Sequence, residues 1–218
     1  MTPEANDKSK GLDDTINSLC CDLKPVKCQC PYSRSALWIL IAISYTLAIS
    51  AMVGLRPNFM DKMLDQNFIF EIGLALATGL TATLVTFWLT LPDSNRYNIF
   101  LGVPATLFCV HVFWMLDRFL IEGVGATPET WLSNCWMNTA LIAGAPAGLA
   151  IVLLRSGASV RPLLLAFNAV LAVTSFGWIG IRFTCPYDSV GKAYFINFLP
   201  FLVIGLGVGI CAKRLFRW

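Results

Sequence analysis

The sequence has few charged residues, a single histidine and no recognisable enzyme motif. Only 13% of its 218 residues are charged, 56% are hydrophobic, and the mean hydropathy is +0.67. This composition excludes an ordinary soluble domain and is typical of a polytopic membrane protein. One histidine cannot build a histidine-rich metal centre, and the chain has no HExxH, P-loop or GxSxG motif. We therefore expect neither an enzyme nor a bound cofactor.

Two further features are missing, and they concern transport and secretion. The two halves show no internal repeat, so the inverted-repeat signature of many transporters is absent. We also expect no cleavable signal peptide, because the polar residues 1–35 precede the first apolar run. That run is moreover too long for the apolar region of a signal peptide.

What the sequence does have is six long apolar runs separated by short polar loops. They lie at about 36–55, 67–91, 98–116, 135–154, 163–181 and 193–212. A helix rises about 1.5 Å per residue, so about 20 apolar residues cross about 30 Å of hydrocarbon. We therefore predict an all-α integral membrane protein with six transmembrane helices in a domain over 36–212. A tail, 1–35, precedes this domain, and a short basic C-terminus, 213–218, follows it.

Lysine and arginine are distributed unequally between the two ends of these predicted spans. With six spans, both termini lie on one side of the membrane. Apart from Lys8 and Lys10, which lie far from the first span, that side carries nine of these residues: Lys24, Lys27, Arg34, Arg96, Arg155, Arg161, Lys213, Arg214 and Arg217. The other side carries five: Arg56, Lys62, Arg118, Arg182 and Lys192. Because loops rich in lysine and arginine stay in the cytoplasm, we predict that both termini are cytoplasmic.

The tail contains a short amphipathic pattern. Leu12, Ile16, Leu19 and Leu23 follow one another at spacings of four, three and four, which places them on one face of a helix over about 12–24. So short a helix is not stable alone in water and needs a surface that covers its apolar stripe. Its polar face carries three aspartates, which anionic lipid would repel, so we favour a protein groove over the membrane surface.

The predicted topology sorts the eight cysteines by compartment. Cys135 and Cys185 lie on the outer side, at the start of the fourth span and after the fifth. Only this pair would meet an oxidising compartment. The pair is either a disulfide, permanent or reversible, or two small residues packed at helix ends. A reversible pair would sense redox state or a soft metal.

Four more cysteines lie in the tail: Cys20, Cys21, Cys28 and Cys30. Their spacing matches no standard zinc motif, which usually has pairs separated by two to four residues. They are therefore weak candidates for a metal site and are otherwise reduced thiols beside the membrane.

Two ionisable residues fall inside predicted spans, Glu71 in the second and His111 in the third. Such residues are costly in a membrane and often functional. We favour a structural polar contact between helices, in which one of three arginines neutralises Glu71: Arg56, Arg118 or Arg182. One alternative is a small ion or solute transporter that uses Glu71 and His111. Another is a structural subunit of a larger membrane complex.

Several short motifs occur in a characteristic order along the chain. They are Leu23-Lys24-Pro25-Val26, Gly54-Leu55-Arg56-Pro57, Arg155-Ser156-Gly157-Ala158 with Arg161-Pro162, Cys185-Pro186-Tyr187-Asp188-Ser189, and Arg214-Leu215-Phe216-Arg217-Trp218. In these motifs the chain resembles, nearly end to end, the NrsF-like family of membrane anti-sigma factors, named for "negative regulator of sigma F".

This resemblance implies a protein of the bacterial inner membrane that holds an extracytoplasmic-function sigma factor inactive. The sigma factor would bind the cytoplasmic tail, and a signal such as heavy metal or oxidative stress would release it. The family's outer cysteine pair corresponds to Cys135 and Cys185, whereas the tail cysteines depart from the family pattern. On this basis the partners are a sigma factor and the lipid bilayer, with no direct binding of nucleic acid.

Overall fold

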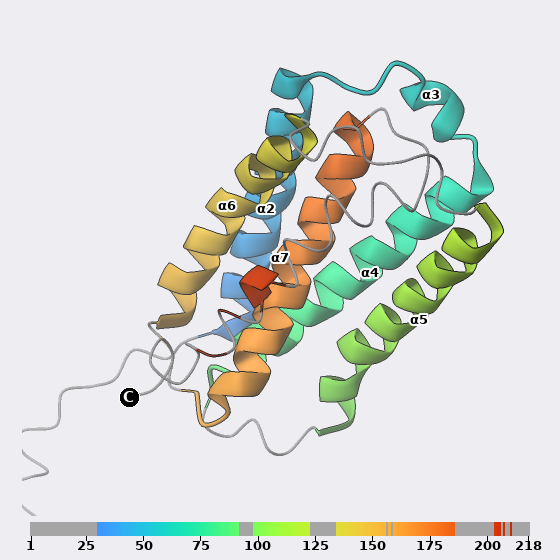
Figure 1. Cartoon of the computed structure of the whole chain (residues 1–218). Helices are drawn as coiled ribbons and strands as arrows, with labels where there is room; N and C mark the ends of the chain where they lie inside the picture. The colour runs from blue at the N-terminus through green and yellow to red at the C-terminus, as the bar shows by residue number, and fades with distance from the viewer. Residues whose placement is uncertain are drawn as a thin grey trace, which may run out of the picture. The chain divides into compact units, whose positions relative to one another are not determined.

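The computed structural model describes residues 30–91, 98–122, 134–155, 157, 159–185, 203–205, 207 and 210. Five long helices are each long and apolar enough to cross a membrane. They are α2 (Pro31–Val53), α4 (Gln66–Trp88), α5 (Asn98–Glu122), α6 (Asn134–Arg155) and α7 (Pro162–Thr184) (Figure 1). A short helix, α3 (Phe59–Lys62), connects α2 to α4. Within these residues the protein has no strand, so the part that the structure describes is all-α.

Two expected elements lie wholly or mostly outside the described residues. The predicted amphipathic helix over about 12–24 falls within residues 1–29. Of the predicted sixth span, 193–212, the structure describes only residues 203–205, 207 and 210, which are helical. The number of spans and the side on which the termini lie therefore stay predictions.

The central helix of this bundle is α7 (Figure 1). It packs against α4 on one side and against α6 and α2 on the other, while α5 packs mainly against α4. Most residues of α7 are apolar or small, and most of its side chains are buried. A Cβ at Gly180 would lie 2.7 Å from Ile142 Cγ2 and 2.8 Å from Thr46 Cγ2. The lack of a side chain there lets α7 approach α6 and α2 closely.

Local signals explain where several of the helices begin and end. Pro31 and Pro162 open α2 and α7, at a position where a missing amide hydrogen costs no helical hydrogen bond. Gly54 follows α2 with a φ of +102°, a left-handed conformation that ends helices and suits glycine. The N-cap of α4 is Asp65, whose carboxylate accepts a hydrogen bond from the Asn67 amide at 3.0 Å.

Two helices, α5 and α7, continue well past the last residue predicted for them. Hydropathy ended the third range near residue 116 and the fifth near residue 181, just before a charged residue in each case. The structure continues α5 to Glu122 and α7 to Thr184. The charged residues are accommodated in different ways, because Asp117 is exposed, whereas the two arginines contact other side chains. The guanidinium carbon of Arg118 lies 5.9 Å from the centroid of the Trp114 ring, and Arg182 meets a carboxylate.

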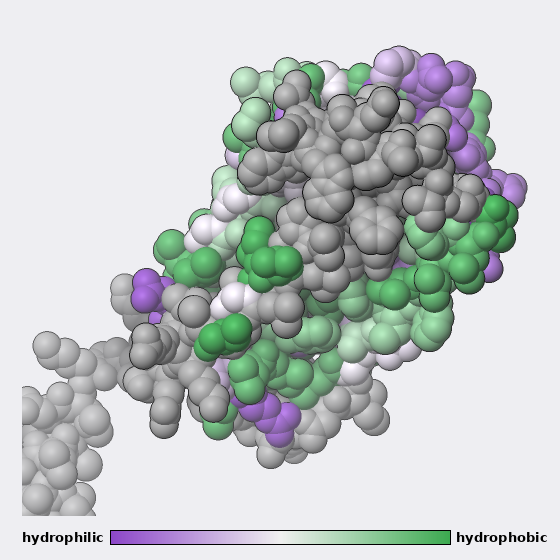
Figure 2. All heavy atoms as spheres, viewed as in Figure 1, coloured by the Kyte–Doolittle hydropathy of each residue, from purple (hydrophilic) through white to green (hydrophobic). Residues whose placement is uncertain are grey.

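The visible surface of the helices is largely apolar (Figure 2). Large apolar side chains such as Leu40, Phe113 and Val152 are more than half exposed. Hydrophilic residues gather at the end of the bundle that holds α3. An apolar flank with polar residues at the end is the pattern expected of helices that face lipid.

Candidate functional site

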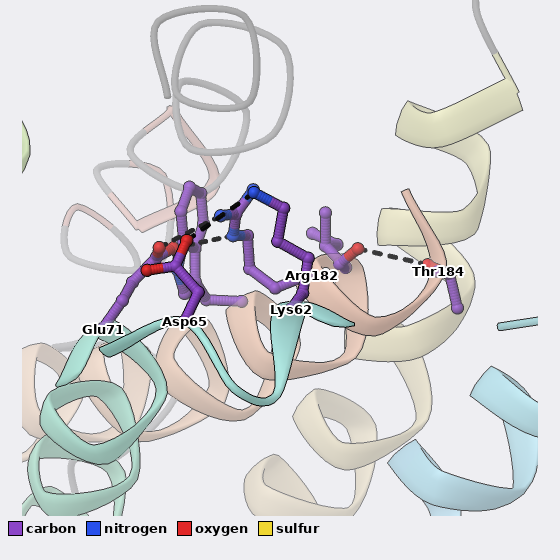
Figure 3. Close-up of polar contacts among 7 residues, drawn as sticks. Lys62, Asp65, Glu71, Arg182 and Thr184 are labelled. Atoms are coloured by element: carbon purple, nitrogen blue, oxygen red, sulfur yellow. Dashed lines mark hydrogen bonds and ion pairs between the residues drawn. The ribbon is translucent and has the colours of Figure 1, made fainter. Parts of the chain in front are cut away.

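Glu71 of α4 and Arg182 of α7 form an ion pair inside the bundle (Figure 3). Arg182 Nε lies 2.8 Å from Glu71 Oε1, and Arg182 Nη2 donates a hydrogen bond to Glu71 Oε2 at 3.1 Å. The two side chains are only 2% and 6% exposed, respectively. A guanidinium that meets both carboxylate oxygens makes a strong and directional contact. This geometry is what a charged pair needs at membrane depth.

Trp178 of α7 provides a further contact to the same carboxylate. Its indole N–H donates a hydrogen bond to Glu71 Oε1 at 2.8 Å. Trp178 and Arg182 are four residues apart, so they lie on the same face of α7 and both reach α4. Glu71 is therefore held by two side chains of the central helix, and both of its oxygens are engaged.

An aromatic ring and a second arginine extend this cluster toward the end of α7. The guanidinium carbons of Arg182 and Arg56 lie 5.4 Å and 6.0 Å from the centroid of the Phe68 ring, within the range of cation–π contacts. The Arg56 backbone N–H donates to the Phe183 carbonyl at 2.9 Å. Phe59 packs edge-on against Phe183, with 5.2 Å between ring centroids. The segment between α2 and α4 is thus fixed to the last turn of α7.

His111 of α5 contacts the cluster through Trp178. The two rings meet at nearly a right angle, with 6.2 Å between their centroids. His111 is buried, with 6% of its surface exposed. The structure therefore brings the two intramembrane candidates, Glu71 and His111, against the same tryptophan. Of the three arginines considered for Glu71, Arg182 makes the direct contact.

Cys185 directly follows α7 and caps it. Its backbone N–H donates to the Ile181 carbonyl at 2.8 Å, its side chain is buried, and its sulfur is engaged in a disulfide bond. Cys135 is the second residue of α6, and its side chain lies outside the described residues. Because α6 and α7 are antiparallel neighbours, the start of α6 and the end of α7 lie at the same end of the bundle (Figure 1). The pairing of Cys135 with Cys185 stays a prediction.

The remaining candidate residues are only partly covered by the structure. Cys30 and Cys109 are free and exposed. The apolar stripe from Leu12 to Leu23 and the tail cysteines Cys20, Cys21 and Cys28 fall among residues 1–29, outside the described part. Across the described ranges, no group of three or more His, Cys, Asp or Glu side chains is arranged to hold a metal ion.

Two members of the buried cluster, Trp178 and Phe68, have no signal in the sequence that separates them from lipid-facing aromatic residues. The four-residue spacing between Trp178 and Arg182 is informative only once α7 is known to continue past residue 181. The interaction of Phe68 with Arg182 depends on the packing of α4 on α7, which hydropathy does not reveal. Chemically, the cluster fixes one helix against another, because both oxygens of its carboxylate are engaged.

The fold and this cluster define a helical membrane protein in which buried charged and aromatic side chains join neighbouring helices. The chain belongs to the family NrsF, described as "Negative regulator of sigma F", whose sequence profile matches residues 19–218. The resemblance seen in the motifs is thereby confirmed over nearly the whole chain. The protein is a negative regulator of a sigma factor, and the partner implied by the family is a sigma factor. No curated protein and no solved structure matches the chain.

Proposed function

We propose that this protein is an anti-sigma factor of the bacterial inner membrane. It binds an extracytoplasmic-function sigma factor through its cytoplasmic tail and releases it on a signal, metal or oxidative stress, that is sensed by cysteines at the outer face. Family membership supports the inhibition of a sigma factor, and the five long apolar helices support a membrane location. The protein acts by binding and not as an enzyme, since inhibition requires only that a surface of the sigma factor be covered.

The observation that carries this proposal is the position of Cys185. This residue is buried, disulfide-bonded and placed at the C-cap of α7, three residues after Arg182. Because α7 packs against α4, α6 and α2, a change in the bonding of Cys185 acts on the helix that most of the bundle contacts. Glu71 of α4 and Phe59 of α3 contact side chains at this end of α7. A movement of α7 would therefore also move α4 and the segment before it.

We further propose Cys135 as the disulfide partner of Cys185. Cys30 and Cys109 are free, and Cys135 lies in the first turn of the helix that runs antiparallel to α7. Disulfides persist in oxidising compartments and are rare in the cytoplasm. A disulfide at this end of the bundle therefore supports the orientation predicted from the lysine and arginine distribution. In that orientation the opposite end, where α2 begins at Pro31, faces the cytoplasm.

The tail is the proposed contact for the sigma factor. Its stripe of Leu12, Ile16, Leu19 and Leu23 needs a surface to cover it, and its acidic face suits a basic DNA-binding partner. Transport by Glu71 and His111 is less well supported, because Arg182 and Trp178 already engage both oxygens of Glu71. A carboxylate held in this way suits a structural contact better than a path for ions.

The proposal is tested by purifying the full-length protein and a variant that lacks residues 2–24 from the native membrane in mild detergent. Mass spectrometry then identifies the proteins that accompany each. We expect a sigma factor with the full-length chain and none with the shortened one. Recovery of no sigma factor with either, or of equal amounts with both, would remove the tail as the site of binding.

A further inference from the structure

A small cavity lies between α4, α5 and α7, next to the buried ion pair. Its volume is about 20 Å³, and it is lined by Ala75, Thr78, Phe108, His111, Thr174, Ser175 and Trp178. About 10–15 Å³ of such space holds one water molecule. The cavity is therefore large enough for one water and too small for an organic ligand.

Each of the three helices contributes a polar side chain to this cavity: Thr78 from α4, His111 from α5, and Thr174 and Ser175 from α7. The hydroxyls of Thr78 and Thr174 donate to carbonyls one turn back, at 2.8 Å and 2.6 Å. Their oxygens still have lone pairs with which to accept a further hydrogen bond. Hydroxyl and imidazole groups from three helices thus line a cavity that is otherwise apolar.

His111 is the lining residue that needs a hydrogen-bond partner in this cavity. Its side chain is nine-tenths buried, its ring packs against Trp178, and across the described ranges its imidazole makes no hydrogen bond. A buried imidazole that makes no hydrogen bond is costly, and native proteins satisfy such groups with protein atoms or ordered water. His111 lines the cavity, so a molecule bound there lies next to the imidazole.

We propose that this cavity binds one water molecule that hydrogen-bonds to His111 and to the hydroxyls of α4 and α7, including that of Ser175. This water is a polar connection between α5 and the central helix. Apart from it, α5 packs mainly against α4 and has limited contact with α7. Between membrane helices, where apolar packing gains little over lipid, a polar connection of this kind contributes to holding a helix in place. The site does not depend on the proposed role of the cysteines or the tail.

The chain offers an internal comparison for testing this site. Trp178 lines the cavity, and 3% of its surface is exposed. Trp38 is equally buried, with 1% exposed, but it is not among the residues that line this cavity. Its indole N–H donates to the Pro146 carbonyl at 3.2 Å. Brief X-ray radiolysis in ¹⁸O-water labels side chains next to bound water, and mass spectrometry locates the label. We expect severalfold more label on Trp178 and His111 than on Trp38. Equal labelling of the two tryptophans would overturn the proposal.

Two variants test whether the polar lining holds the water. Ser175→Ala removes a hydroxyl from the cavity, and His111→Phe replaces the imidazole with an apolar ring. Thr106→Val on α5 is the matched control, because that exposed hydroxyl donates only to the Gly102 carbonyl of its own helix. Size-exclusion chromatography confirms that each variant is folded. We expect both cavity variants to lower the labelling of Trp178 severalfold and the control to leave it unchanged. Undiminished labelling in folded Ser175→Ala and His111→Phe would contradict a water held by these groups.

Discussion

Arg182 in α7 contacts both carboxylate oxygens of Glu71 in α4 through its Nε and Nη2 atoms, and it lies three residues before the disulfide-bonded Cys185. The central helix is thus joined to its main neighbour at the end where a change in thiol bonding would act. A buried ion pair is not by itself strong evidence for stability, because the cost of removing two charges from water offsets their attraction. Removing one partner of the pair is far more costly than removing both, because the remaining charge stays buried without compensation.

The first prediction follows from this asymmetry. Glu71→Gln removes the carboxylate and leaves the Arg182 guanidinium buried beside a neutral group. We expect the variant to lose about 3–5 kcal/mol of unfolding free energy, the usual cost of breaking a buried pair on one side. The double variant Glu71→Leu, Arg182→Leu removes both charges and should be more stable than Glu71→Gln. Denaturation of the purified protein in detergent measures both variants against the unmodified protein.

Lys62→Gln provides the control for this prediction. Lys62 pairs with Asp65 at 3.6 Å, but the two side chains are 29% and 36% exposed, so their interaction is screened by solvent. We expect a change of at most about 1 kcal/mol, as for other surface pairs. If Glu71→Gln proves no more harmful than Lys62→Gln, the buried pair does not fix α4 to α7 as inferred.

A second prediction concerns the close approach at Gly180. A methyl group there would meet side chains of α6 and α2 at under 3 Å, so Gly180→Ala must displace these side chains or the helices that carry them. We expect a loss of about 1–3 kcal/mol, typical of overpacking. Gly148→Ala in α6 is the control, because no neighbouring atom lies within 4 Å of the added Cβ. It should be neutral or slightly stabilising, since alanine favours a helix more than glycine does. Equal effects of the two substitutions in a thermal melt would contradict the packing around α7.

The membrane helices could be predicted from the sequence because their apolar runs are long and uninterrupted. The ends of these helices were harder to predict, since hydropathy treats a charged residue as the end of a span. At Arg182 this assumption failed, because the guanidinium is compensated by Glu71 within the bundle. Nor could the sequence tell which of three arginines, Arg56, Arg118 or Arg182, pairs with Glu71. The pairing depends on how α4 packs against α7 and on the helical face that Trp178 and Arg182 share.

The family could also be predicted from the sequence, because its motifs keep their order along the whole chain. The cavity beside His111 could not be predicted from the sequence. Thr78, His111 and Ser175 belong to three helices that are far apart in sequence, and each residue alone is unremarkable in a membrane helix. Only their convergence produces a polar site. Residues that function through contacts between distant helices leave no local pattern in a single sequence.

A third prediction tests the tail as the contact for the sigma factor. Ile16→Asp with Leu19→Asp places two charges in the apolar stripe, so we expect the sigma factor to be released without a signal. Expression from a promoter that depends on the sigma factor should then be constitutive. Asn17→Asp with Ser18→Asp adds the same charge outside the stripe and should preserve repression. Repression that persists in the stripe variant would rule out this face of the tail as the binding surface.

The last prediction concerns the cysteines at the end of α7. If Cys135 and Cys185 are bonded to each other, either single serine substitution abolishes the same bond, so the two variants should share one phenotype in the promoter assay. The double variant should be no more severe, because two residues that act as one unit are not additive. Cys109→Ser is the control, since that thiol is free and exposed, and this substitution should have no phenotype.

Peptide mapping of the unreduced protein should recover a linked Cys135–Cys185 fragment. Different phenotypes for the two single variants, together with a fragment linking Cys185 to another cysteine, would move the sensing role away from Cys135 while leaving α7 as the helix on which the disulfide acts.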